Sequence, residues 1–226
     1  MSTGAIQGGP STGRAAEVTT SIVRELEEEI ALGVRHPRER LIEDELMERF
    51  GAKRHAIRSA LQTLESRGSV ERRANVGALV RAYSAKEVRD LYTVRELLET
   101  TCAASIDLPV APDGLDPLVE VQRAHDRAVE ARDRRGALRA NLRFHEVLFG
   151  LSGNQTLVDA VRQHARMAST IRSLTVADDA HLLQAQAEHW RMIEALRDGD
   201  SDALVTVCRA HLAPSRDAYL ARLELA

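Results

Sequence analysis

Three of the eight histidines occupy positions from which they could bind a metal ion. His145, His189 and His211 each lie with aliphatic residues at helical spacing, on three different predicted helices. Asn141 precedes His145 by one helical turn, so both side chains can point at one ion. Imidazole nitrogens suit zinc, nickel, copper or iron(II). Each histidine could instead be an ordinary core residue, but three of them in one bundle favour a divalent metal site, with zinc or nickel first.

Arg95 lies on the inward face of another predicted helix, where a buried guanidinium needs an anionic partner. That partner is either the carboxylate of a small effector or the nearby Glu99. Asn154 and Arg166 are further candidates for binding an effector. No general base stands out beside the histidines, so the pattern indicates binding rather than catalysis, and we expect no catalytic residue.

A second kind of chemistry is suggested by basic residues near the N-terminus. Residues 53–81 contain seven Lys or Arg against two Asp or Glu, although the net charge of the whole chain is −3. Such a local basic patch favours a polyanionic partner. The patch includes Arg54, His55 and Arg58 on one face of a predicted helix, and Arg72 and Arg73 on a predicted hairpin. A solvated basic surface on a structural module is the alternative.

The elements that carry these residues define two domains and a tail. Residues 1–13 are expected to be a disordered tail, 14–83 a winged helix-turn-helix, and 84–226 an all-helical domain. The first domain is predicted to have helices near 18–33, 43–50 and 54–67 and a β-hairpin within 69–82. The second is predicted to be an antiparallel bundle of six or seven helices, near 85–106, 115–134, 136–152, 155–176, 180–198 and 201–224.

Composition excludes several classes of protein. The 226 residues are 44% hydrophobic and only 3% aromatic, which is typical of a folded chain with an aliphatic core. No apolar run approaches the roughly 18 residues of a membrane helix, and the N-terminus does not look like an export signal. The two cysteines are most simply reduced thiols. We therefore expect a cytoplasmic protein with no membrane partner.

The segment from Arg40 to Leu64 resembles the DNA-binding domain of GntR-type bacterial transcription regulators. It has a Leu-x-Glu-x-x-Leu run, a glycine, and an Arg-x-x-x-Arg helix followed by Leu-x-x-Leu. The resemblance covers about residues 18–82 and implies that Arg54 and Arg58 contact operator DNA, with Lys53 and His55 beside them. Gly77 matches the glycine of the wing turn. Since Asp44 stands where some members have a basic residue, we do not count it as a phosphate contact.

Residues 85–222 resemble the all-helical FCD domain of the FadR-like branch of that family. The matching segments are 141–148 with 152–154, then 188–193, then 209–212. Many members bind a divalent metal through an Asp or Asn and three His, which implies Asn141, His145, His189 and His211 here. The resemblance also implies that a small carboxylate completes the coordination.

Together these observations predict a homodimeric repressor that binds a palindromic operator in double-stranded DNA. A small organic acid, bound at the metal site, would change the positions of the two DNA-binding domains. Two alternatives remain open. One is a metal-free regulator that senses an acyl-type ligand, and the other is a metal-dependent helical enzyme.

Overall fold

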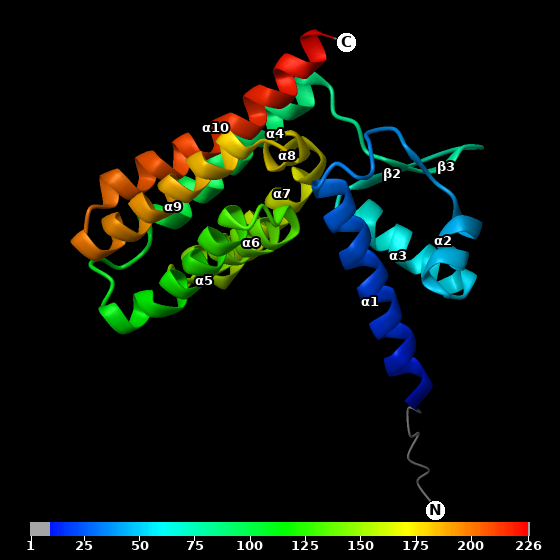
Figure 1. Cartoon of the computed structure of the whole chain (residues 1–226), viewed down its shortest axis with the longest axis horizontal. Helices are drawn as coiled ribbons and strands as arrows, with labels where there is room; N and C mark the ends of the chain where they lie inside the picture. Colours follow the sequence, from blue (N-terminus) through cyan, green and yellow to red (C-terminus); the bar gives the residue numbers. More distant parts are fainter. Residues whose placement is uncertain (1–9, 226) are drawn as a thin grey trace, which may run out of the picture.

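The computed structural model describes residues 10–225, and its N-terminal part is the expected winged helix-turn-helix (Figure 1). We call residues 10–83 the N-terminal domain and residues 84–225 the helical domain. The elements of the N-terminal domain are α1 (Pro10–Ala31), β1 (Arg40–Leu41), α2 (Glu43–Phe50), α3 (Arg54–Ser66), β2 (Val70–Arg73) and β3 (Gly77–Val80).

The strands form a three-stranded antiparallel sheet in the order β1-β3-β2. The predicted hairpin is therefore confirmed, but it is joined by a short strand that the sequence pattern did not predict. Arg40 of β1 pairs with Leu79 of β3, and Val70 of β2 pairs with Val80 on the other side. Gly77 has a φ of +99° at the hairpin turn, a conformation that glycine adopts without strain.

The core of the N-terminal domain determines which face of α3 is free. Ile57, Ala60 and Leu64 of α3 are completely buried and pack against Leu26 and other residues of α1. Burial of Ile57 and of Leu64 stabilises the domain by roughly 1.5–3 kcal/mol each. The opposite, basic face of α3 is left in solvent.

The helical domain consists of seven helices, within the predicted six or seven. They are α4 (Ala85–Ala104), α5 (Pro112–Glu130), α6 (Arg134–Gly150), α7 (Gln155–Met167), α8 (Ser169–Val176), α9 (Asp179–Asp198) and α10 (Ser201–Glu224). Figure 1 shows α4 and α10 side by side along one edge of the bundle, and α5 beside α6 on the other. Phe144, Leu148, Met192 and Ile193 lie at the centre of its largest apolar core.

Several element boundaries differ from the prediction. The expected helix 155–176 is two helices, α7 and α8, which meet at Ala168. The Tyr83 hydroxyl lies 2.8 Å from the carbonyl oxygen of Met167, the last residue of α7. Pro112 and Pro117 do not break α5. Pro112 lies at the start of the helix, where no N–H is needed. Pro117 lies inside the helix, between the buried Leu115 and Leu118.

Only part of the predicted N-terminal tail, residues 1–13, lies within the described part of the chain. Helix α1 begins at Pro10, so residues 10–13 are its first turn, and residues 1–9 lie outside the described part of the chain. Proline suits this position because the first N–H groups of a helix have no helical partner.

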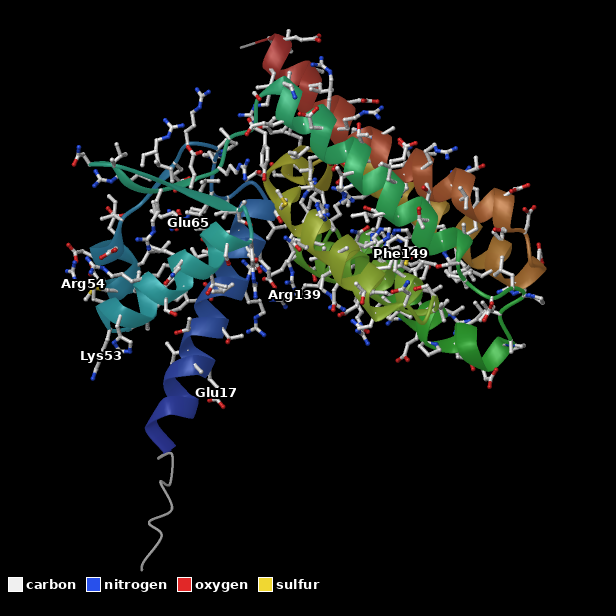
Figure 2. All side chains as sticks on the ribbon, turned by 180° about the vertical axis from the view of Figure 1, so that it is seen from behind. Glu17, Lys53, Arg54, Glu65, Arg139 and Phe149 are labelled. Atoms are coloured by element: carbon white, nitrogen blue, oxygen red, sulfur yellow. The ribbon has the colours of Figure 1, made fainter. Side chains whose placement is uncertain are left out.

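The two domains are connected by more than their linker. Helix α1 packs against α8, and Glu28 of α1 accepts two hydrogen bonds from the Arg139 guanidinium of α6, at 2.7 and 2.9 Å. Figure 2 shows Arg139 at the boundary between the domains. The backbone N–H of Tyr83 donates to the Tyr219 hydroxyl of α10. The position of α1 is thus determined partly by the helical domain.

Candidate metal centre and DNA interface

The three predicted histidines come together in the helical domain. His145 is supplied by α6, His189 by α9 and His211 by α10, and one ligand nitrogen from each lies within 4.8 Å of the others. The Nε2 atoms of His145 and His211 are 3.1 Å apart. Ring centroids within this group are 4.9 to 5.2 Å apart. Three helices therefore direct imidazoles at one point, as the apolar faces predicted.

Two hydrogen bonds orient these rings. The Nδ1 atom of His211 lies 2.6 Å from a carboxylate oxygen of Glu188, and the Nδ1 atom of His189 lies 2.8 Å from the amide oxygen of Gln122. Because each of these oxygens accepts, each Nδ1 carries a hydrogen, and in a neutral ring the Nε2 atom then has the lone pair. Asp126 in turn accepts from the Gln122 amide nitrogen. Such outer partners fix the tautomer of metal-binding histidines.

The histidines fit a divalent transition metal. The Nε2 atom of His189 is buried and has no hydrogen-bond partner among the described residues, which is costly unless another group binds it. Burial lowers the pKa of His145 and of His189 well below the usual value, and the nearby His211 lowers both further. Neutral imidazoles with free lone pairs are the form that metals bind.

A single acidic metal ligand would supply both an oxygen atom and a negative charge. Here Asn141 can supply the oxygen atom, and Glu188 carries the charge. Asn141 lies one turn before His145 on α6 and lines the same cavity, so its amide oxygen can join the three imidazoles. It brings no charge. Glu188 is 3% exposed, and although burial raises its pKa, the hydrogen bond with His211 is among the causes that bring the pKa below the usual value. The negative charge beside the three histidines thus comes from Glu188, which is hydrogen-bonded to His211.

Sequence reasoning missed Glu188, Gln122 and also His125. His125 of α5 is completely buried and its ring centroid lies 5.2 Å from that of His189. Burial lowers the pKa of His125 to about 4. The signal for Glu188 was its place directly before His189. No sequence signal distinguished His125 from other histidines.

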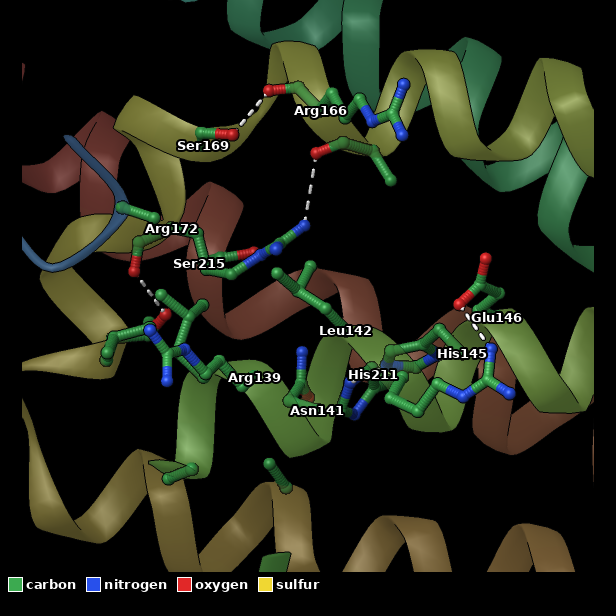
Figure 3. A pocket seen from close by; sticks show the side chains of 18 of the residues that line it. Arg139, Asn141, Leu142, His145, Glu146, Arg166, Ser169, Arg172, His211 and Ser215 are labelled. Carbon is green, nitrogen blue, oxygen red and sulfur yellow. Dashed lines mark hydrogen bonds and ion pairs between the residues drawn. The ribbon is translucent and has the colours of Figure 1, made fainter. Parts of the chain in front are cut away.

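The histidine cluster opens into a cavity of about 440 Å³ (Figure 3). Arg95, Arg166 and Arg172 all line it, from α4, α7 and α8. Helix α1 contributes Glu28 and three more residues to the same wall, so the N-terminal domain closes part of the cavity. Such a size suits a small organic ligand.

The arginines of this cavity differ in how they are neutralised. Arg95 is 6% exposed and pairs with Glu99 at 2.9 Å, which is the internal partner considered above. Arg172 donates to the backbone oxygen of Ala165 and has no carboxylate partner among the described residues. Burial and the neighbouring Arg95 lower the pKa of Arg172 to about 10. The charge of Arg172 is therefore not neutralised by a direct ion pair.

The remaining effector candidates are placed differently. Arg166 lines the cavity, although much of its side chain is exposed. Asn154 does not line the cavity, so its assignment to an effector site is corrected. Its side-chain oxygen accepts from the backbone N–H of Leu157 and caps the start of α7. This is the usual role of an asparagine directly before a helix.

The predicted DNA-contacting residues gather on one outer surface of the N-terminal domain. Figure 2 shows Lys53 and Arg54 at the exposed start of α3. His55 and Arg58 are also exposed, as are three residues of the hairpin: Arg72, Arg73 and Gly77. A helix that presents its N-terminal side chains in this way can enter the major groove.

Acidic residues of α2 hold the two main arginines of this surface. Arg54 pairs with Asp44 at 2.5 Å, and Arg58 pairs with Glu43 at 3.0 Å. Both arginines are more than half exposed, at 51% and 60%. Exposed pairs of this kind contribute about 0–1 kcal/mol, so phosphate or base acceptors can replace the carboxylates.

A winged helix-turn-helix joined to a helical domain defines a DNA-binding transcription regulator. Residues 18–80 match the model of the gntR family of bacterial regulatory proteins, and residues 90–214 match the FCD domain. The chain belongs to the gntR family, in the branch that carries an FCD domain.

Relatives agree with this assignment. The HTH-type transcriptional regulator YdhC of Bacillus subtilis (strain 168) is 25% identical over 188 residues, which are 83% of this chain and 84% of that protein. The Nta operon transcriptional regulator of Aminobacter aminovorans is 28% identical over 189 residues, 81% of this chain and 86% of that protein. These proteins are regulators and not enzymes, so the enzyme alternative is set aside.

Solved structures show the same fold. Escherichia coli McbR/YncC has a TM-score of 0.77 at 20% identity, covering 92% of this chain and 98% of that one. A GntR protein from Rhodococcus sp. RHA1 has a TM-score of 0.74 at 23% identity, covering 90% and 97%. Among the described residues, no helix is both long and apolar enough to cross a bilayer.

Proposed function

We propose that this regulator is a repressor that a small carboxylate releases from its operator, and that the carboxylate binds in the cavity at a divalent metal. Asn141, His145, His189 and His211 would hold the metal, with zinc or nickel the best matches to imidazole ligands. The metal would supply a Lewis-acidic position for a carboxylate oxygen. The observation that carries the proposal is the convergence of three histidine nitrogens at a cavity that α1 also lines.

The charges around the cavity support an anionic ligand. Arg172 has no carboxylate partner among residues 10–225, and an anion stabilises a guanidinium that is largely removed from water. Arg95 and Arg166 lie on the same cavity wall. A carboxylate between the metal and these guanidinium groups would meet positive charge at both sides.

The shared wall also suggests how the ligand acts on DNA binding. Glu28 of α1 is 8% exposed and is held by Arg139 of the helical domain. A ligand that enters beside this ion pair favours one position of α1 over another, which shifts the population of domain arrangements. In a homodimer on a palindromic operator, both α3 helices must fit the major groove at a fixed spacing. Such a regulator acts in the cytoplasm, where the DNA is.

The test combines metal content with ligand response. Purified wild-type chain is analysed for metal, and its thermal midpoint is measured with a panel of small carboxylates, with and without chelator. We expect near-stoichiometric metal and a shift that chelator abolishes. The His189→Ala variant should lose both, and His164→Ala, on α7 away from the cluster, should lose neither.

DNA binding completes the test. Fluorescence anisotropy with the chain's own promoter region should show binding below micromolar concentration that the active carboxylate weakens. If the wild-type chain contains no metal and a fatty acyl ligand weakens DNA binding instead, the metal-free alternative replaces this proposal. If carboxylates strengthen DNA binding, the direction of regulation is reversed.

A further inference from the structure

His125 of α5 is the feature of the cavity that neither the metal ligands nor the arginines explain. Its side chain is completely buried, and neither ring nitrogen has a hydrogen-bond partner among the described residues. A neutral imidazole has one donor and one acceptor, and leaving a buried polar group unpaired destabilises the folded chain. An apolar residue at this position could fill the same space and would leave no polar group unpaired.

The neighbours of His125 show where its partner belongs. The ring is one of the groups that line the cavity, and its centroid lies 5.2 Å from that of His189. The group of convergent nitrogens nevertheless consists of His145, His189 and His211, without His125. His125 therefore lies beside the metal centre and faces the same space, but it is not placed as a ligand.

We propose that His125 is a ligand-binding residue of this cavity, whose ring N–H donates a hydrogen bond to an oxygen of the carboxylate bound at the metal centre. Its place beside the centre lets it contact that oxygen without a bond to the metal. The inference rests on the proposed function and adds a specificity residue to it. His125 would make the cavity prefer a carboxylate to an apolar group of the same size. The carboxylate oxygen accepts from the His125 N–H, whereas the apolar group would leave that N–H unpaired.

The experiment uses full-length chain loaded with Co²⁺, whose visible absorption reports on the ligands, and acetate as the probe. His125→Phe keeps a ring of similar volume and removes the donor, whereas His125→Gln keeps a donor. We expect His125→Phe to bind Co²⁺ with wild-type stoichiometry and spectrum, and to bind acetate about 10- to 100-fold more weakly, the effect of one hydrogen bond to a charged group. His125→Gln should lie between the two. His164→Phe is the control and should match the wild type.

Other outcomes overturn the inference and identify what failed. Acetate binding within twofold of wild type in His125→Phe makes His125 a packing residue. Loss of Co²⁺ from both His125 variants makes it part of the metal site itself. If the wild-type chain binds no Co²⁺, or binds it without responding to acetate, the proposed function has failed and this inference fails with it.

A measurement on the wild-type chain keeps the test independent of variant folding. In Zn²⁺-loaded protein with ¹⁵N-labelled histidine, acetate should shift the ring N–H resonance of His125. An unchanged resonance at saturating acetate refutes the proposed hydrogen bond.

Discussion

The buried pair of Arg95 and Glu99 permits a sharp prediction about stability. The two side chains are 7% and 4% exposed, and no other carboxylate faces Arg95 among its described ion pairs. Burial acts to lower the pKa of Arg95, but the Glu99 carboxylate and Tyr92 together leave that pKa raised. The Glu99→Gln substitution keeps the shape and removes the charge. It should then leave two uncompensated guanidinium groups, those of Arg95 and Arg172, in one cavity wall.

The expected magnitude follows from this burial. Removing one partner of a buried ion pair costs about 3–5 kcal/mol, and for a chain of this size each kcal/mol lowers the thermal midpoint by about 2–4 °C. Glu99→Gln should therefore melt roughly 6–20 °C below wild type in differential scanning calorimetry. The Arg95→Met, Glu99→Leu double variant removes both charges and should melt much closer to wild type.

Glu96 provides the matched control on the same helix. It pairs with Arg209 at 2.9 Å, as close as the buried pair, but the two side chains are 41% and 54% exposed. Glu96→Gln should change the free energy of unfolding by less than about 1 kcal/mol. Glu99→Gln within 1 kcal/mol of wild type, or a Glu96→Gln cost equal to that of Glu99→Gln, would refute the reasoning that burial makes the difference.

Three further predictions concern DNA, the domain contact and pH. Arg58→Ala should weaken operator binding by about 1–3 kcal/mol in fluorescence anisotropy, and Arg89→Ala on the helical domain should not; equal losses would place the DNA interface elsewhere. Tyr83→Phe removes the hydrogen bond to Met167 and should lower the free energy of unfolding by about 1 kcal/mol, measured by urea titration; no change would show that this bond is replaceable. The pKa values of His145 and His189 are lowered, so their ring nitrogens stay unprotonated as the pH falls. Bound Co²⁺ should therefore be half released only below about pH 6. Half release at pH 6.5 or above contradicts this prediction.

Local signals explain which parts of the fold could be predicted. Helix α2 has the predicted bounds, because three acidic residues begin it and Gly51, with a φ of +56°, ends it. The apolar faces of α6, α9 and α10 also predicted that His145, His189 and His211 point inward. Helical periodicity carries this information wherever a helix has a single buried face.

What could not be predicted depends on contacts between distant residues. Strand β1 is two residues long, too short for an alternating pattern, and it exists because β3 pairs with it. At the break between α7 and α8, the Met167 carbonyl accepts from the Tyr83 hydroxyl, 84 residues earlier in the chain. Gln122 and His125 join the site only because α5 packs against α9. Asn154 was misassigned because its local role as a helix cap gives no distinctive spacing.

Under the proposed function, the wall that α1 shares with the cavity would make operator DNA and effector act on each other symmetrically. Any factor by which the carboxylate weakens DNA binding is also the factor by which DNA weakens carboxylate binding. A dimer seated on its operator would then respond only at a higher effector concentration than a dimer free in the cell. The copies of the protein that hold no DNA would fill first, and the concentration at which the gene responds would depend on how many such copies there are.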